Sequence, residues 1–307
     1  MKLQFIWIQK YIVDFLKRVS GTYLPQTSFG EHSEDEFSII PEPYQVEYTG
    51  GFFIRPGHVS FHVPEYKELF HILFGTTVPY TMTEDSVVHF VRATLSDIHA
   101  YQIIITEKMI TVNYQDEATF RCAVSTFIQL LQKDKIPTGT IYDFPLYSWR
   151  GLHIDVARHF MPIEFLKELI RKMYLQKLNI LHIHLTDDQG WRFESKQYPK
   201  LHTIGSKRRE TVIGNKLLPF VHTNYKGDGI PHEGFYTQEE LKELVTYAQI
   251  YGIDLVPEID IPGHGTALLV AYPEHSAYIA PKEVETDWGV FHNMLSPQKE
   301  TITFLKN

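Results

Sequence analysis

The sequence predicts an α+β domain followed by an incomplete (β/α)8 barrel of the TIM type. Short strands followed by a helical segment occupy residues 38–146, which is typical of an α+β domain. From residue 147 to 307 strands alternate with helices, and this alternation indicates a parallel sheet. Charged and imidazole side chains follow the alternating strands, and barrel enzymes carry their chemistry at such strand ends.

Composition excludes several classes of protein. The chain has 307 residues, 43% of them hydrophobic and 21% charged, which is ordinary for a soluble globular protein of two domains. The formal net charge of −8 argues against a nucleic-acid partner, since phosphate binding needs a concentrated basic surface. The short basic run at 207–209 is interpreted as a solvated loop. Cys122 is the only cysteine, so no intrachain disulfide can form.

Residues 1–37 are predicted to be an N-terminal helix and a linker. Apolar residues recur at helical spacing between Tyr11 and Val19, but Lys10 and Asp14 interrupt the apolar run. The segment is therefore neither a transmembrane span nor a convincing signal peptide, and the compartment is not assigned. Residues 20–37 are rich in Gly, Ser, Pro and acidic residues, as linkers are.

The α+β domain at 38–146 is expected to have a structural role, because it contains no cluster of catalytic residue types. Two segments separated by a tight polar turn are expected to form a hairpin. A helix follows them, with apolar residues on one face. The predicted strands are Gln45–Tyr48, Phe52–Ile54, Val59–Val63, Val87–Ala93, Tyr101–Thr106 and Met109–Tyr114, and the helix is Ala118–Gln132.

Residues 147–307 are predicted to contain three strands and two long helices. Pro162 is placed at the first position of one helix, with Phe165 among its inward residues. Thr237 and Glu240 have the spacing of a capping box, and Val245 is among the inward residues of the helix that follows. The strands are Leu152–Val156, Leu178–Leu185 and Ile253–Ile259; the first helix runs to Gln176, and a long loop covers Ser195–Gly234.

The length of this second domain leaves two interpretations. A complete (β/α)8 barrel takes roughly 250 residues, and about 200 is near the minimum. Residues 147–307 therefore form either a smaller open sheet or the first three to four βα units of a barrel. We favour the barrel portion.

The first of these strands delivers Asp155, Arg158 and His159 at its end. The planar guanidinium group offers five donors, a fork that suits paired oxygens such as carboxylate, phosphate or vicinal sugar hydroxyls. The alternative is a structural one, in which Arg158 only pairs with Asp155 or Glu164.

The second strand places His182 and His184 on one face, because side chains alternate along a strand. Paired histidines at a barrel strand hold zinc in some hydrolases, although a packed core histidine is the commoner case. Asp187 and Asp188 follow, and they either line a site or cap a helix. The third strand ends in Glu258, Asp260 and His264 among two prolines and two glycines, which indicates a shaped loop.

Four long segments resemble the β-N-acetylhexosaminidases of glycoside hydrolase family twenty. The resemblance covers about residues 40–305, since IIPEPYQVEY and the 101–151 region resemble the accessory α+β domain of that family. The segments are HIDVARHF (153–160), HIHLTDDQGWR (182–192), GFYTQEELKELVTYAQIYGIDLVPEIDIPGHG (234–265) and LSPQKETITFL (295–305).

The resemblance implies hydrolysis of terminal non-reducing N-acetyl-β-D-hexosamine residues by a retaining, substrate-assisted mechanism. It implies no cofactor and no metal, and its partners would be oligosaccharides or glycoconjugates that contain N-acetylhexosamine. Arg158 matches the arginine that holds hydroxyls of the terminal sugar. Asp187 and His264 match residues that support the catalytic pair. Asp188, Trp191 and Glu258 match motif positions for which only a structural role is expected, and Asp188 and Glu258 are counted among the residues that support the site.

The sequence departs from the family at the catalytic pair itself. In the family an aspartate and a glutamate after strand four, within a His-x-Gly-Gly-Asp-Glu segment, orient the acetamide and protonate the leaving oxygen. No such segment occurs here, so no catalytic residue is assigned within the chain. The chain is expected to be a truncated and, by itself, inactive portion of the enzyme. The alternatives are a non-catalytic glycan-binding derivative and a metal-dependent hydrolase that uses His182, His184, His264 and a carboxylate.

Overall fold

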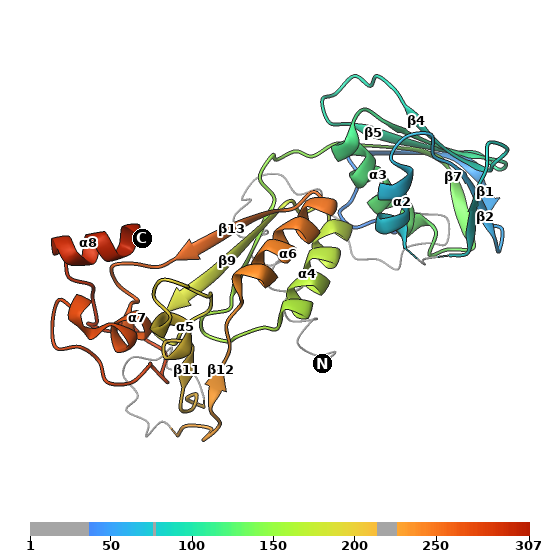
Figure 1. Cartoon of the computed structure of the whole chain (residues 1–307). Coiled ribbons are helices and arrows are strands. Elements are labelled where there is room, and N and C mark those ends of the chain that lie inside the picture. Colours follow the sequence, from blue (N-terminus) through green and yellow to red (C-terminus); the bar gives the residue numbers. More distant parts are fainter. Residues whose placement is uncertain (1–36, 76–77, 214–225) are drawn as a thin grey trace, which may run out of the picture. The chain divides into compact units, whose positions relative to one another are not determined.

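The computed structural model describes residues 37–75, 78–213 and 226–307 (Figure 1). The helix predicted near the N-terminus lies outside these residues. Residues 39–307 belong to one compact unit. None of the helices described in these ranges is long and apolar enough to cross a membrane.

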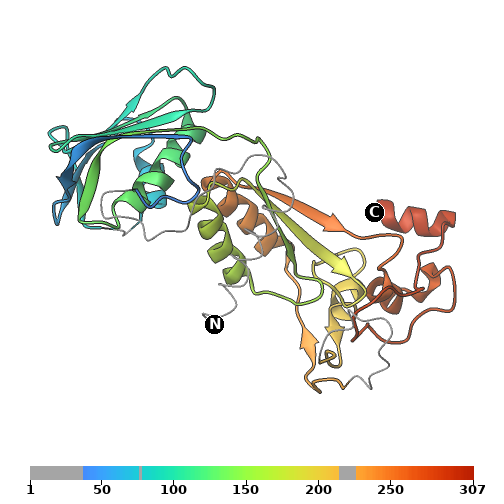
Figure 2. The ribbon, with the colours of Figure 1, turned by 180° about the vertical axis from the view of Figure 1, so that it is seen from behind.

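The N-terminal part of this unit is a seven-stranded sheet with two helices on one face (Figures 1 and 2). Phenylalanine rings from the strands and from both helices pack in edge-to-face and tilted pairs between the two layers, which places the core of this part there. In the order β1-β7-β5-β6-β4-β2-β3, the strands are β1 (Gln45–Ile54), β7 (Lys135–Asp143), β5 (Tyr101–Ile105), β6 (Ile110–Tyr114), β4 (Val88–Arg92), β2 (Val59–His62) and β3 (Tyr80–Met82); the helices are α2 (Lys67–Phe74) and α3 (Glu117–Leu130).

The predicted β5–β6 hairpin and helix α3 are confirmed. Two separate strands at 45–48 and 52–54 were expected, but they are one strand, β1, whose register shifts between Tyr48 and Phe52. Strand β7 was not predicted because Pro137 and Gly139 are strand-breaking signals. A Cβ atom at Gly139 would lie 2.0 Å from the Glu47 carbonyl oxygen, so this close approach of β1 requires glycine.

The second sheet contains the three predicted parallel strands, with β9 between the other two. A two-residue strand, β10 (Gly190–Trp191), pairs with β9 in the antiparallel direction. The parallel strands are β8 (Gly151–Asp155), β9 (Ile180–Asp187) and β13 (Asp254–Ile259), and the two long helices are α4 (Ile163–Leu175) and α6 (Gln238–Ile250).

The two faces of this parallel sheet differ in chemistry. Helices α4 and α6 lie side by side along the strands (Figures 1 and 2). The apolar face of the sheet includes Leu181 and Ile183, which are buried. On the other face, His153 pairs with His182 across β8 and β9, and Glu258 pairs with His184 across β13 and β9. The prediction that His182 and His184 share a face is therefore confirmed.

Three details of the helical and loop predictions are wrong. Phe165 and Val245 were expected to face inward, but they are 38% and 42% exposed. Helix α4 instead buries Leu166 and Ile170, and α6 buries Leu244 and Ala248. Pro162 is the N-cap of α4 and not its first residue. The segment expected to be a long loop contains α5 (Lys200–Thr203) and a ribbon of β11 (Lys207–Arg208) and β12 (His232–Glu233); after β13 come α7 (Thr266–Ala271), a 3₁₀ turn (Pro273–His275) and α8 (Lys299–Lys306).

The predicted capping box of α6 is confirmed. The Thr237 hydroxyl accepts from the Glu240 backbone N–H at 3.1 Å, and the Glu240 carboxylate accepts from the Thr237 backbone N–H at 2.8 Å. We expect Thr237→Ala to lower the free energy of unfolding by about 1 kcal/mol, because one of these two bonds is lost. Urea denaturation measures the change. Thr246→Ala, an exposed position of the same helix, is the control; an equal loss there would contradict the assignment.

Candidate functional site

Asp187 is the centre of the polar cluster at the end of β9. Its side chain is fully buried, and its Oδ2 atom lies 2.7 Å from Arg158 Nη2 and 2.7 Å from His184 Nε2. Its Oδ1 atom lies 3.0 Å from His264 Nδ1. Burial by itself raises the pKa of Asp187, but hydrogen bonds from His184 and the Asp188 backbone, with the charges of Arg158 and His264, lower it overall. The carboxylate therefore stays charged at neutral pH.

Arg158 is fixed in the turn that follows β8. Asp155 accepts from the Arg158 backbone N–H at 2.9 Å and from its Nη1 at 2.8 Å. Gln189 Oε1 accepts from the Arg158 Nε–H at 3.0 Å. With the ion pair to Asp187, these bonds hold the guanidinium plane in one orientation, while the side chain remains 25% exposed.

His184 connects Asp187 to β13. Its Nε2 atom faces Asp187 and its Nδ1 atom lies 2.9 Å from Glu258 Oε2, while the residue is only 4% exposed. Burial lowers the pKa of this imidazole, but the hydrogen bonds to Asp187 and Glu258 outweigh that effect and raise it to about 9. A chain of alternating charge therefore runs from Glu258 through His184 and Asp187 to Arg158.

His264 adopts a left-handed backbone conformation, with φ of 51°, in the loop after β13. This conformation brings its Nδ1 atom within 3.1 Å of Asp188 Oδ2 as well as within reach of Asp187. Asp188 also accepts from the backbone N–H and the hydroxyl of Thr266, the first residue of α7. Asp188 therefore holds both His264 and the first residue of α7, although the N-cap of that helix is Gly265.

The structure brings Arg158, Asp187, Asp188 and His264 together, and Glu258 joins them through His184. Arg158 also makes the structural pair with Asp155 that was considered as an alternative, whereas Glu164 pairs with Lys167.

Trp191 and His159 do not contribute side chains to this cluster. Trp191 is 5% exposed, packs in a hydrophobic core, and donates from its indole to the Phe193 carbonyl. The His159 ring lies 4.5 Å from the ring of His232. Gln189, which holds Arg158, was not identified from the sequence, although it lies within the HIHLTDDQGWR segment.

The residues of the metal-hydrolase alternative do not converge on one point. Among the described residues, His264 groups with Asp187 and Asp188, whereas His184 groups with Glu258 and His153. A single ion held by His182, His184 and His264 is therefore not supported by the arrangement.

Two buried arginines support the backbone around the site. Arg192 is fully buried and donates to backbone carbonyl groups on four segments, those of Val156, Ala157, Gln189, Ser206 and Gly234. Burial lowers the pKa of Arg192 to about 9, and the nearby Arg208 contributes to this shift. Arg208 is 4% exposed and donates to the Gln189 carbonyl, so the interpretation of its segment as a solvated loop is wrong for this residue.

His232 is expected to make the free energy of unfolding depend on pH. Its Nε2 accepts the Phe160 backbone N–H at 2.9 Å, and burial, aided by Arg208 and Arg192, lowers its pKa to about 4. An unfolded histidine has a pKa of about 6.5, so the unfolded state binds more protons between these values. The stabilisation by neutral His232 is complete above the pKa that this histidine has in the unfolded state. It is lost as the pH falls through the pKa of His232 in the folded state.

The test compares the wild-type chain with His232→Gln, whose amide oxygen can still accept the Phe160 N–H. We expect the free energy of unfolding of the variant to fall less between pH 6.5 and 4, measured by urea denaturation at each pH. His71→Gln, in the seven-stranded part, is the control and should follow the wild type. Identical pH dependence of all three proteins would contradict the prediction.

Comparisons with known proteins agree in family over both parts of the chain. Residues 36–144 match the profile described as glycosyl hydrolase family 20, domain 2, and residues 147–307 match glycosyl hydrolase family 20, catalytic domain. A β-hexosaminidase of Akkermansia muciniphila is 46% identical over 56% of this chain and 32% of its own length. A β-hexosaminidase of Vibrio furnissii is 34% identical over 77% of this chain and 39% of its own length.

Solved structures show the same relationship. A β-N-acetylhexosaminidase of Bacteroides fragilis has a TM-score of 0.70 at 30% identity and is matched over 87% of this chain and 52% of its own. The N-acetyl-β-hexosaminidase of Streptomyces plicatus in complex with Thio-NAglucal has a TM-score of 0.71 at 28% identity, over 87% of this chain and 55% of its own. The chain thus spans about a third to half of the length of these relatives.

These matches confirm the predicted fold class, an α+β domain followed by part of a (β/α)8 barrel, with its first three parallel strands in β8, β9 and β13. The matched residues 147–307 also include the four segments on which the resemblance to this family was based. The chain belongs to glycosyl hydrolase family 20.

Proposed function

We propose that this chain supplies part of the sugar-binding site of a retaining β-N-acetylhexosaminidase, which removes terminal non-reducing N-acetyl-β-D-hexosamine residues from glycans by a substrate-assisted mechanism. The observation that carries the proposal is the convergence of Arg158, Asp187 and His264 from three different strand ends. Family membership supports the class of reaction.

Arg158 is the group that would hold the terminal sugar. A guanidinium group has five N–H donors in a planar fork. The contacts to Gln189, Asp155, His184 and Asp187 occupy at most four of them within the described part of the chain, so at least one N–H on Nη2 is left for a ligand. The partial exposure of the side chain allows a sugar hydroxyl to reach this N–H.

Asp187 and His264 would act from behind the sugar. The Asp187 carboxylate is fully buried and neutralises the guanidinium of Arg158. It therefore fixes the arginine side chain and does not itself bind the sugar. The His264 side chain is 32% exposed, and its ring is anchored through Nδ1 to two carboxylates, leaving Nε2 for a group on the open side. We assign both residues supporting roles.

Proton donation is not assigned to any residue of this chain. The 307 residues contain no His-x-Gly-Gly-Asp-Glu segment. A positioned general acid typically contributes about 10²–10⁴-fold to the rate. We therefore expect the chain to bind the sugar, and hydrolysis to require an acid that these residues do not provide.

The test measures two quantities on the chain and on the longest polypeptide that its coding region encodes. The first is binding of N-acetyl-D-glucosamine by nuclear magnetic resonance, and the second is hydrolysis of an aryl N-acetyl-β-D-glucosaminide. The proposal expects binding by both polypeptides and hydrolysis only where the acidic pair is present. Absence of sugar binding in both would contradict it, and binding without hydrolysis in both would favour a non-catalytic glycan-binding protein instead.

A further inference from the structure

We propose that Gln189 is a positioning residue, whose side chain ties the orientation of Arg158 to the docking of segment 285–287. Its Oε1 atom accepts from the Arg158 Nε–H at 3.0 Å, and its Nε2 atom donates to the Asp287 carbonyl at 2.8 Å. The effect on a ligand rests on the proposed binding of the sugar by Arg158. The coupling itself is a property of the chain without sugar.

The two hydrogen bonds of this amide depend on each other. The Arg158 Nε–H can only donate and the Asp287 carbonyl can only accept. One orientation of the amide therefore satisfies both partners, and a half-turn of the amide group breaks both bonds together. Gln189 is only 3% exposed, so water has little access to replace either partner. Loss of one bond accordingly weakens the restraint on the other.

The main chain fixes the position from which this amide reaches its partners. Gln189 lies in the turn between β9 and β10. Its carbonyl accepts from Arg208 Nη1 at 3.1 Å and from Arg192 Nη2 at 3.4 Å, and both arginines are buried. The backbone of Gln189 is therefore anchored, and the remaining freedom of its side chain is removed by Arg158 and Asp287.

Segment 285–287 is held against the same turn by bonds of two kinds. The Glu285 N–H donates to the Asp188 carbonyl at 3.2 Å, which joins main chain to main chain. The bond from Gln189 to the Asp287 carbonyl is instead made by a side chain. A change at the guanidinium group can reach the segment through this second bond.

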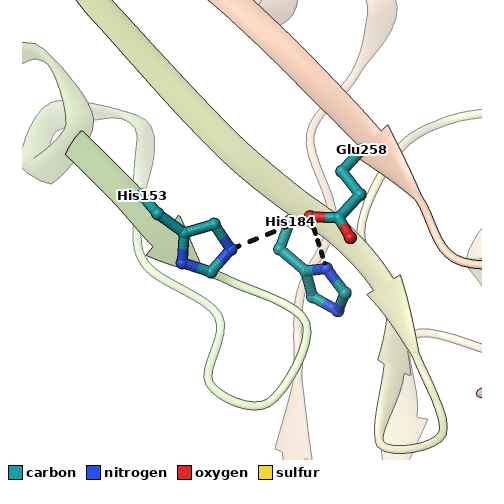
Figure 3. A group of neighbouring side chains, drawn as sticks. All are labelled: His153, His184 and Glu258. Atoms are coloured by element: carbon teal, nitrogen blue, oxygen red, sulfur yellow. Dashed lines mark ion pairs between the residues drawn. The ribbon is translucent and has the colours of Figure 1, made fainter. Parts of the chain in front are cut away.

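Gln189 contributes a contact that the charged partners of Arg158 do not make. Carboxylates hold the two terminal nitrogens of the guanidinium. One of them, Asp187, is itself held by His184, whose Nδ1 atom faces the Glu258 carboxylate (Figure 3). Gln189 holds Nε and adds no further negative charge. With all three nitrogens held, the N–H on Nη2 that is left for a ligand has a fixed direction.

The coupling is tested first without sugar. Gln189→Met keeps the length of the side chain and removes both bonds, whereas Gln189→Glu keeps an acceptor for Arg158 and loses the donor. In nuclear magnetic resonance spectra, we expect the Arg158 Nε–H signal to be lost to exchange with water in Gln189→Met and to persist in Gln189→Glu.

Hydrogen exchange at 285–287, followed by mass spectrometry, reports the other end of the coupling. It should become about three- to ten-fold faster in Gln189→Met and Gln189→Glu, because one hydrogen bond to the segment is lost. Coupling is reciprocal, so Arg158→Ala should also speed exchange in the segment, although Arg158 has no printed bond to it.

The second measurement is the affinity for N-acetyl-D-glucosamine. A guanidinium group that is free to move must be fixed by the sugar itself, and this lowers affinity about three- to ten-fold. We expect this loss in Gln189→Met and recovery of most of the affinity in Gln189→Glu. In an Arg158→Ala background, Gln189→Met should cause no further loss, because the group that it positions is absent.

Gln129→Met is the matched control. Gln129 also bonds through both atoms of its amide, to the Ile40 backbone and to the Leu175 carbonyl, but it lies on α3. This variant should change neither the Arg158 Nε–H signal nor the exchange at 285–287. Urea denaturation checks that every variant is folded.

The proposal is overturned if Gln189→Met leaves both the Arg158 Nε–H signal and the exchange at 285–287 unchanged, or if Gln129→Met alters them equally. Equal losses of sugar affinity from Gln189→Met with and without Arg158 would contradict the positioning role. Absence of sugar binding by the wild-type chain, with the sugar-free results as expected, would contradict the proposed function and not the coupling.

Discussion

Replacing Arg192 with methionine is expected to lower the free energy of unfolding by about 3–5 kcal/mol, because each buried carbonyl left without its partner costs about 1–3 kcal/mol. The guanidinium is fully buried, and its hydrogen bonds end on backbone carbonyls of β8's C-terminal turn, the β9–β10 turn and the segments around Ser206 and Gly234. Methionine fills a similar volume but donates nothing, so these carbonyls lose their partner in a buried environment. Few other single changes would remove so many contacts at once.

Urea denaturation followed by tryptophan fluorescence measures this change. Arg192→Lys should recover only part of the loss, because an ammonium group lacks the planar fork that reaches several carbonyls. Gly190→Ala tests the same guanidinium by crowding it, because the added Cβ atom would lie 2.3 Å from the Arg192 guanidinium carbon. Arg209→Met, at a side chain that is 67% exposed, is the control. A loss at Arg192 no larger than at Arg209 would show that these bonds do not stabilise the fold.

Arg158→Ala is expected to weaken the hold on the terminal sugar on the order of 10²-fold. Hydrogen bonds to a charged group contribute about 1.5–3 kcal/mol each, and each 1.4 kcal/mol is about ten-fold in affinity. The change should raise the dissociation constant for N-acetyl-D-glucosamine in this chain. In a hydrolytically active polypeptide that contains the chain, it should lower kcat/KM by a similar factor.

Arg158→Lys separates charge from geometry, because lysine keeps the positive charge beside Asp187 but cannot present two donors in one plane. We expect it to bind the sugar little better than Arg158→Ala. Arg209→Ala controls for the general loss of an exposed arginine, and a urea denaturation curve checks that each variant is folded. Unchanged sugar affinity in a folded Arg158→Ala protein would remove this residue from the site.

The elements that hold the site could be predicted from local sequence patterns. The apolar runs of β8, β9 and β13 and the Thr237–Glu240 capping box are signals within a few residues of one another, so the parallel sheet followed from them. Alternation along β9 also placed His182 and His184 on one face. The resemblance to family 20 identified Arg158, Asp187 and His264, which the structure brings together.

What could not be predicted depends on contacts between distant segments. Arg208 belongs to a lysine–arginine run that was interpreted as a solvated loop. Its side chain is nevertheless buried, where it donates to the Gln189 carbonyl. Strand β7 was missed because its proline and glycine are tolerated only by the particular pairing with β1. The structural and functional readings of Arg158 are also not exclusive. One guanidinium group has enough donors to pair with Asp155 and Asp187 and still face a ligand.

We propose above all that the ends of β8, β9 and β13 form one sugar-binding surface around Arg158. The most direct test is a crystal structure of the chain with N-acetyl-D-glucosamine at saturating concentration. We predict a pyranose ring with a hydroxyl oxygen about 3 Å from Arg158 Nη2, at the N–H that Asp187 does not occupy. A sugar bound at another surface, with Arg158 in contact only with Asp155, Asp187 and Gln189, would contradict the claim.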